Sequence, residues 1–295
     1  MKRINNEEVF REAEQSGVPT IKGDRKIVWF EEFGDRSTLE KKWLYRTQMR
    51  STDATLNTDE KHIEVKDSLL GLHSYRVDEK DRVGELEGIE WTLPQALPAY
   101  DKMVFRRGYL EMRAKVPFRH GTWPSFWMLT YEPLMESRLR SEIDIFEIFS
   151  SPDTVVCNLH KSLRDKDGKL IARCQLDGSM VSKKRFTFEN PENLNDEYHI
   201  YGMEWTDKDI SFLIDGVPYT TISLTESYTN NPDLQDMDNH QDYHFVILNN
   251  FVFTPGHHWC PEKYRILPED PSPVDYYIDW IRLYQKDGED ILVEE

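Results

Sequence analysis

The chain has 295 residues, with 54 Asp and Glu against 37 Lys and Arg, so its formal net charge is −17. This balance argues against a nucleic-acid binder, which needs a cationic face, and against docking on an anionic membrane. Aromatic residues make up 12% of the chain, which argues against disorder. We therefore expect a soluble, acidic globular protein, and its many rings and carboxylates favour carbohydrate binding because flat rings stack on sugars.

The cysteines and the N-terminus bear on the compartment. Cys157, Cys174 and Cys260 are an odd, scattered set, which predicts neither a disulfide framework nor a zinc site, and we expect mostly buried free thiols. No stretch has the apolar length of a membrane span. The first 17 residues have no apolar signal core, so we expect a cytoplasmic protein, or a secreted or periplasmic one whose signal has been removed.

The chain pattern predicts one all-β domain. Residues 1–26 are expected to be a helical or flexible lead-in, residues 27–288 a single domain, and residues 289–295 a tail. A polar loop is expected at 225–242 and an irregular Pro-rich segment at 254–275. Short apolar runs between turn clusters predict a β-sandwich or jelly roll, with strands at 27–33, 63–65, 109–116, 126–129, 142–149, 155–160, 198–205, 210–214, 217–222, 245–251 and 277–284.

Residues 109–116 show the clearest strand periodicity. Apolar residues alternate with Tyr109, Glu111, Arg113 and Lys115, which gives the strand one apolar and one polar face. The polar face suits either plain surface or the floor of a polar cleft. Further on, Asp215-Gly216 between two β-rich runs predicts a hairpin with a tight turn.

The most informative segment is SEIDIFEIF, residues 141–149, which carries three carboxylates in an otherwise apolar strand. In a regular strand Glu142 and Asp144 share one face and Glu147 points to the other, where burial of its charge would be unfavourable. A β-bulge near Ile145–Phe146 adds one residue and turns all three carboxylates to one side. The sequence therefore predicts a bulged strand with a carboxylate face.

Three neighbouring carboxylates raise one another's pKa, which separates an ionised nucleophile from a proton-bearing acid, as glycosidic cleavage requires. Two alternatives stay open from the motif alone. The segment suits an exposed acidic edge strand, and three carboxylates also suit a Ca²⁺ or Mg²⁺ site, although no nearby turn or Gly supplies further ligands.

Residues 142–147 match the ExDxxE signature of glycoside hydrolase family 16, which the chain resembles. Further blocks resemble the family in its order, from about residue 27 to 286, namely IVWFEEFGD at 27–35, GYLEMRAKVPFRHGTWPSFWML at 108–129, YHIYGMEWTDKDISFLIDG at 198–216 and IDWIRLYQ at 278–285. The two residues between Asp144 and Glu147 resemble the bulged laminarinase, agarase, carrageenase and porphyranase branches.

The resemblance implies a β-jelly-roll sandwich of the concanavalin A-like lectin/glucanase type, with an open concave substrate cleft. It implies an endo-acting retaining hydrolase in which Glu142 is the nucleophile, Glu147 the general acid and then base, and Asp144 an assisting carboxylate. Other family positions imply sugar-binding roles for Glu111, Arg113, Trp123, Trp127, Asn158, His160, Asn249 and Phe251.

Departures from the common pattern concern the substrate. Arg140 lies two residues before Glu142, and Lys161 and Arg164 follow His160, so this basic group either contacts an acidic or sulfated glycan or pairs with neighbouring acids. The resemblance also implies a structural calcium ion at Asp279, with no cofactor needed for catalysis.

We expect a monomeric hydrolase whose partner is a polysaccharide or oligosaccharide, with no nucleic acid or membrane. The expected substrate is a β-1,3- or β-1,3/1,4-glucan. A β-galactan of the agar, carrageenan, porphyran or keratan type, a transglycosylase activity and a carbohydrate-binding lectin are the alternatives.

Overall fold

The computed structural model describes residues 1–46, 54–135, 139–165, 167–175, 185–224, 240–253 and 266–294. Of Cys174 only the backbone is described, while Cys260 and most of the two predicted irregular segments, 225–242 and 254–275, lie outside these residues. Among the described residues, no helix is long and apolar enough to cross a membrane.

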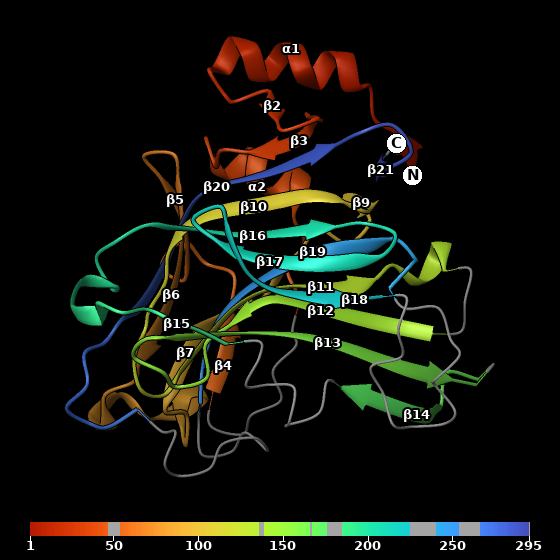
Figure 1. Cartoon of the computed structure of the whole chain (residues 1–295). Coiled ribbons are helices and arrows are strands. Elements are labelled where there is room, and N and C mark those ends of the chain that lie inside the picture. Colours follow the sequence, from red (N-terminus) through yellow and green to blue (C-terminus); the bar gives the residue numbers. More distant parts are fainter. Residues whose placement is uncertain are drawn as a thin grey trace.

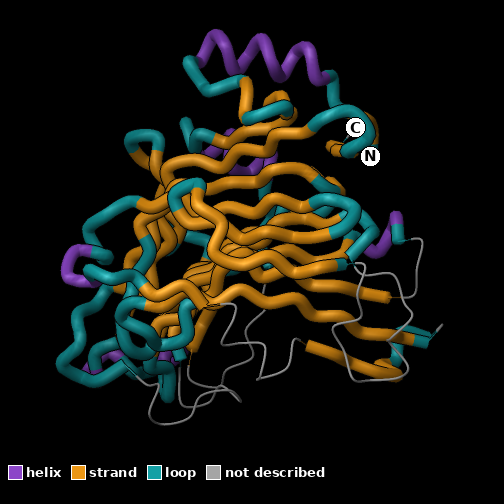
Figure 2. Tube along the Cα trace, in the orientation of Figure 1, coloured by secondary structure: helices purple, strands orange, loops and turns teal. Residues whose placement is uncertain are grey.

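Nearly all regular structure belongs to two large sheets, and helix is confined to short segments (Figure 2). The first sheet has the order β1 (Lys2–Arg3), β21 (Asp290–Val293), β9 (Met103–Arg106), β19 (His244–Val252), β11 (Thr122–Thr130), β12 (Leu139–Glu147), β13 (Thr154–Arg164) and β14 (Leu170–Gln175), with β8 (Leu97–Pro98) beside β19 and β15 (Arg185–Thr187) beside β13.

The second sheet lies against the first. Its order is β18 (Val217–Ser223), β17 (Asp209–Ile214), β16 (His199–Trp205), β10 (Gly108–Lys115), β20 (Val274–Gln285), β6 (Leu69–Arg76), β7 (Trp91–Pro94) and β4 (Ala54–Asn57), with β3 (Arg25–Glu31) beside β20, β2 (Ile21–Lys22) beside β3 and β5 (Ile63–Lys66) beside β6.

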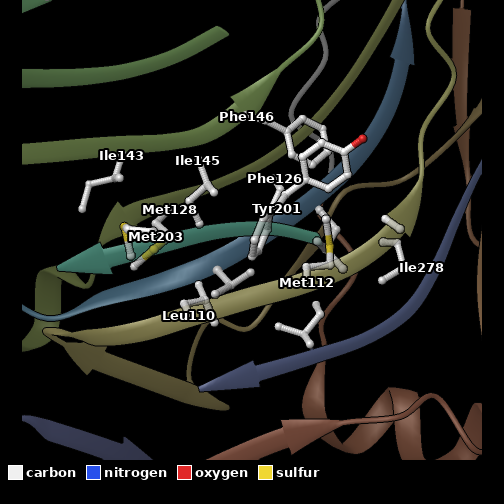
Figure 3. Close-up of a cluster of buried hydrophobic side chains, with 14 of the residues drawn as sticks. Leu110, Met112, Phe126, Met128, Ile143, Ile145, Phe146, Tyr201, Met203 and Ile278 are labelled. Carbon is white, nitrogen blue, oxygen red and sulfur yellow. The ribbon is translucent and has the colours of Figure 1, made fainter. Parts of the chain in front are cut away.

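The main hydrophobic core fills the space between the two sheets, as period-two alternation requires. Figure 3 shows side chains from β11 and β12 meeting side chains from β10, β16 and β20. The rings of Phe146 and Tyr201 lie 4.6 Å apart across this interface. Both residues are almost completely buried, so β12 is anchored through its inner face and presents the other face outward.

The N-terminal segment is helical rather than flexible. Helix α1 (Asn6–Ser16) lies beyond β2 and β3 in Figure 1, and its buried Ala13 packs with Ile27 and Tyr284 in a small hydrophobic cluster. Gly17 ends the helix at φ 72°, a left-handed conformation that suits glycine. A second helix, α2 (Arg36–Lys42), is capped by the Asp35 side chain. Short 3₁₀ helices lie at Glu79–Asp81, Gly84–Leu86, Glu132–Leu134 and Pro191–Asn193.

Candidate active site

Strand β12 carries the three carboxylates and lies inside the first sheet, hydrogen-bonded to β11 on one side and β13 on the other. The alternative of an exposed acidic edge strand is therefore wrong. Asp144 pairs with Asn158, but Glu147 pairs with Val156, so three steps along β12 match two along β13. This extra residue is the predicted bulge, which the register confirms.

The bulge decides which side chains face the core. Ile143, Ile145, Phe146 and Ile148 are all almost fully buried in the hydrophobic cluster between the sheets. Because Ile145 and Phe146 are consecutive and both face inward, alternation restarts at Glu147, which points to the outer face of the sheet. The Glu147 carboxylate accordingly meets side chains from β11 and β13 on that outer face.

Glu147 lies in a half-buried environment that favours its protonated form. Its pKa is raised to about 8, first by burial and then by the charge of Asp144. Two hydrogen bonds oppose this rise, one from Trp123 Nε1 to Oε1 at 3.0 Å and one from Asn158 Nδ2 to Oε2 at 3.4 Å. At neutral pH the carboxyl group therefore carries a proton that it can donate.

Glu142 and Asp144 share His160 as a neighbour. His160 Nε2 lies 3.1 Å from Asp144 Oδ2 and 3.6 Å from Glu142 Oε1. Asp144 is almost fully buried, whereas 28% of the Glu142 side chain is exposed, so a ligand reaches Glu142 more easily. Within the described part of the chain, these three side chains are the group whose ligand atoms lie close enough for a metal ion, within 4.8 Å of one another. The 3.1 Å contact is that of a hydrogen bond.

Aromatic and amide side chains extend the site along β11 and β19. Trp127 Nε1 donates to Asn249 Oδ1 at 2.7 Å, and Asn249 Nδ2 donates to the Trp123 carbonyl at 3.3 Å. Phe251 packs against Trp123, with ring centroids 6.4 Å apart. The structure thus gathers the residues predicted for the site on β11, β13 and β19 next to β12, namely Trp123, Trp127, Asn158, His160, Asn249 and Phe251.

One side of this outer face is covered by other parts of the chain. Trp91 and Leu93 of β7 form a second hydrophobic cluster with Phe245 and Ile247 of β19. A pocket of about 610 Å³ adjoins this layer and includes Glu142. Its lining comes from several segments of the chain, among them residues 44–46, 98, 100, 129, 130, 132, 140–142, 160–162, 164 and 170.

The prediction that Glu111 and Arg113 belong to this site is wrong. Both lie on β10 of the second sheet, and their apolar neighbours on that strand face the shared core, so the two side chains point to the opposite side of the sandwich. Glu111 is buried there beside Lys22 Nζ at 2.9 Å, and Arg113 is paired with Asp279. Period-two alternation identifies the two faces of a strand but not the sheet to which it belongs.

The calcium prediction for Asp279 stays a prediction, with the carboxylate engaged by Arg113 in this structure. Within the basic group, Lys161 has only 1% of its surface exposed because the alternation on β13 turns it inward, whereas His160 and Arg164 face outward. Arg140 also faces outward and pairs with Glu132, Nη2 to Oε2 at 2.8 Å. Cys157 is buried and not part of a disulfide, as expected.

Two aromatic residues of the site were not predicted. The Phe253 ring is stacked on Trp123 at 5.2 Å and 2°, and the Phe149 ring lies 5.7 Å from Trp123. The signal for Phe253 was available, because it continues the alternation of Asn249 and Phe251 by two more residues. The two rings fix the plane of the Trp123 indole beside Glu147.

Comparison with known proteins decides the family. The profile of glycosyl hydrolases family 16 matches residues 55–240. The chain belongs to this family. It is 27% identical over 203 residues to a beta-glucanase of Rhodothermus marinus, covering 68% of this chain and 64% of the relative, and 23% identical over 289 residues to glucan endo-1,3-beta-glucosidase A1 of Niallia circulans, covering 91% and 39%. The match thus spans less than two thirds of the length of each of these two relatives.

Solved structures of similar proteins share the fold. The catalytic domain of an endo-1,3-beta-glucanase (laminarinase) from Thermotoga petrophila RKU-1 superposes with a TM-score of 0.63 at 20% identity, covering 90% of this chain and 99% of that one. A structure described with endo-acting O-glycanases of prominent members of the human gut microbiota, which initiate mucin breakdown, gives 0.66 at 25% identity, covering 91% and 93%. The predicted jelly-roll sandwich is confirmed.

Proposed function

We propose that the protein is an endo-acting retaining glycoside hydrolase that cleaves a β-1,3- or β-1,3/1,4-glucan by double displacement. The observation that carries the proposal is the bulge in β12, which turns Glu142 and Glu147 to one face while the pKa of Glu147 is raised to about 8. A retaining enzyme needs one ionised and one protonated carboxyl on the same side of the glycosidic bond.

In the first step, the Glu142 carboxylate attacks the anomeric carbon and forms an ester bond to the sugar. The glycosidic C–O bond breaks, and its oxygen takes the proton of Glu147 as it leaves. In the second step, the Glu147 carboxylate removes a proton from water, whose oxygen attacks the anomeric carbon and displaces Glu142. Two inversions give a product with the anomeric configuration of the substrate.

Asp144 and His160 serve this cycle through charge. The Asp144 charge is the second cause of the raised pKa of Glu147, after burial, so it helps to keep the acid protonated before the first step. His160 Nε2, 3.1 Å from Asp144, stabilises that charge in its buried place. Its nitrogen also lies 3.6 Å from Glu142 Oε1, so the imidazole stands between the two carboxylates.

The neighbouring rings supply a platform for the sugar chain. Trp123 and Trp127 lie four residues apart on β11, so their side chains share one face of the strand. Both indole nitrogens are hydrogen-bonded. Indoles held in this way stack on sugar rings with little loss of conformational entropy. The names of the curated relatives, beta-glucanase and glucan endo-1,3-beta-glucosidase, support a glucan as the substrate.

A β-galactan of the keratan type is the second candidate. The similarity to the structure described with O-glycanases that initiate mucin breakdown, at 25% identity and a TM-score of 0.66, supports a substrate other than a glucan. The chemistry of the carboxylates is the same for both candidates, and the difference lies in the sugar that the pocket accepts.

The test is a panel of β-glucans and β-galactans with a reducing-end assay, comparing the wild type with Glu142→Ser. We expect the wild type to release oligosaccharides from at least one glucan, and the variant to lose more than about a thousandfold in rate. Proton NMR of the first product should show the β-anomer. Turnover of galactans alone would replace the glucan by the second candidate, and no turnover on any chain would overturn the hydrolase.

A further inference from the structure

The pocket beside Glu142 combines a nucleophile with arginines, although the chain as a whole carries a net charge of −17. Three arginines line it, Arg46, Arg140 and Arg164, against the two carboxylates Glu132 and Glu142. Such a local excess of guanidinium groups at a substrate-binding surface indicates an anionic ligand, because arginine forms paired hydrogen bonds with planar or tetrahedral anions.

The register of β12 and β13 brings two of these arginines together. Arg140 lies directly opposite Ser162, and Arg164 follows two residues later on the same outer face of β13. Such diagonal neighbours have side chains within reach of one another, at about 7–8 Å between their backbones. Arg140 also lies two residues from Glu142, or about 7 Å along the strand. A glycan that is held at Glu142 and extends along β12 and β13 would thus bring an anionic substituent toward these two arginines.

The existing contacts of these arginines leave them able to bind an anion. The Arg140–Glu132 pair is partly exposed, at 35% and 49% of the two side chains, so it contributes little and can exchange for a ligand. Arg164 donates from Nη1 to the Gly168 carbonyl at 2.8 Å, which orients its guanidinium. Within the described part of the chain, neither Arg46 nor Arg164 forms an ion pair with a carboxylate.

We propose that Arg140 and Arg164, with Arg46 from another segment of the pocket lining, bind an anionic substituent of the glycan, either a sulfate ester or a uronic acid carboxylate. Among chains with the same backbone, the form that carries such a substituent is then bound more tightly than the neutral glucan, which remains a substrate. This inference rests on the proposed function, because it assumes that the glycan is held at Glu142.

The experiment compares oligosaccharides of one backbone in neutral, sulfated and carboxylated form. Binding is measured by isothermal titration calorimetry in a Glu147→Gln background, which keeps this side chain neutral and suppresses turnover. We expect Arg164→Ala and Arg140→Ala each to weaken binding of a charged chain about tenfold or more, with a change under about twofold for the neutral chain. Salt at about 0.5 M should weaken only the charged chains.

The control is Arg11→Ala, which removes the same charge from exposed helix α1 and should leave all binding unchanged. If Arg164→Ala fails to fold, Arg140→Ala carries the same test. If the arginine variants weaken binding of the sulfated oligosaccharide, the ligand is a sulfate ester; if they weaken binding of the carboxylated one, it is a carboxylate. Equal losses on charged and neutral chains, or no preference for charge, would overturn the arginine site alone. Charged chains that bind without wild-type turnover would overturn the hydrolase and keep the site.

Discussion

The indole Nε1 of Trp123 donates a hydrogen bond of 3.0 Å to Oε1 of Glu147. A hydrogen bond to a carboxylate favours its ionised form, so this contact opposes the burial and the Asp144 charge that raise the pKa of Glu147 to about 8. The indole thus helps to set the pKa of the proposed acid while its ring forms part of the proposed sugar platform. The same carboxyl can therefore act as an acid first and as a base afterwards.

Trp123→Phe keeps an aromatic ring and removes this hydrogen bond. We expect kcat/KM of the wild type to fall above pH about 8, where Glu147 loses its proton. In the variant this fall in kcat/KM should occur at higher pH, because the ionised form of Glu147 has lost a hydrogen-bond donor. The matched control is Trp127→Phe. The Trp127 indole donates to Asn249 and not to Glu147, so this variant should leave the pH of the fall in kcat/KM unchanged. A fall in kcat/KM at unchanged or lower pH in Trp123→Phe would argue against Glu147 as the acid.

Glu147→Gln should stabilise the protein at alkaline pH. The pKa in the folded state, about 8, lies above the usual value of 4.5, so the folded state holds the proton more tightly and stability falls as pH rises from about 4.5 to 8. The glutamine side chain does not ionise, so the variant does not lose this stability as the pH rises. We expect the free energy of unfolding to rise by roughly 1 to 3 kcal/mol at pH 8 and to change little at pH 4.5.

Chemical denaturation at the two pH values measures the difference. Glu60→Gln, at an exposed turn, is the control and should show no such pH dependence. A Glu147→Gln variant that is no more stable than the wild type at pH 8 would show that burial does not keep this carboxyl protonated.

Deletion of Ile145 tests the bulge. Without this residue the pairing of β12 with β11 and β13 becomes continuous, and Asp144 and Glu147 keep their outward face. We expect a folded protein that loses about 2–5 kcal/mol of stability with the buried Ile145 side chain. Deletion of Ile143 should prevent folding, because it turns the charged Glu142 toward the core. Circular dichroism and thermal unfolding measure the stability of the two deletion variants. If the variant without Ile145 were less stable than the variant without Ile143, the register of β12 would be contradicted.

The bulge itself was predictable from the sequence. Three carboxylates in one apolar strand conflict with strict alternation, and burial of a charge is so unfavourable that an extra residue is the simplest solution. The resemblance implied a cleft position for Asn158 and His160, and alternation along β13 agrees with it, because these two side chains are partly exposed while Cys157 is buried. Local periodicity thus determines which side chains share a face.

Sheet membership was not predictable in this way. Glu111 and Arg113 have the pattern of a cleft strand, yet β10 belongs to the second sheet, because pairing partners are chosen over long distances in the sequence. Strand β6 was missed because Gly71, His73 and Ser74 interrupt its apolar run. Ser74 is buried and donates to the Asn250 carbonyl at 2.7 Å, a partner that lies 176 residues away.

His244, on β19, contacts the strand that carries the proposed nucleophile. Its Nε2 lies 2.8 Å from Ser141 Oγ, next to Glu142, and its Nδ1 lies 2.8 Å from the Asp242 carbonyl. Burial lowers the pKa of His244 to about 4, below the usual 6.5, so the stability it contributes is complete above pH 6.5 and is lost as the pH falls toward 4. In His244→Gln the decrease in the free energy of unfolding between pH 7 and pH 4.5 should be smaller than in the wild type by roughly 1 to 3 kcal/mol.

Denaturant midpoints at pH 7 and pH 4.5 test this expectation. His120→Gln, at an exposed position, is the control and should show the acid loss of the wild type. If His244→Gln lost as much stability in acid as the wild type, the buried imidazole would not be the group that titrates.

The most direct test of the central claim, the division of roles between Glu142 and Glu147, is azide rescue with an activated aryl β-glycoside. In Glu142→Gly, azide should occupy the space of the missing carboxylate and displace the leaving group once, giving an α-glycosyl azide. In Glu147→Ala, azide should attack the glycosyl ester on Glu142 and give a β-glycosyl azide. Proton NMR of the two products decides. Opposite anomers in this order are the predicted result, and the reverse order, or the same anomer from both variants, would contradict the assignment.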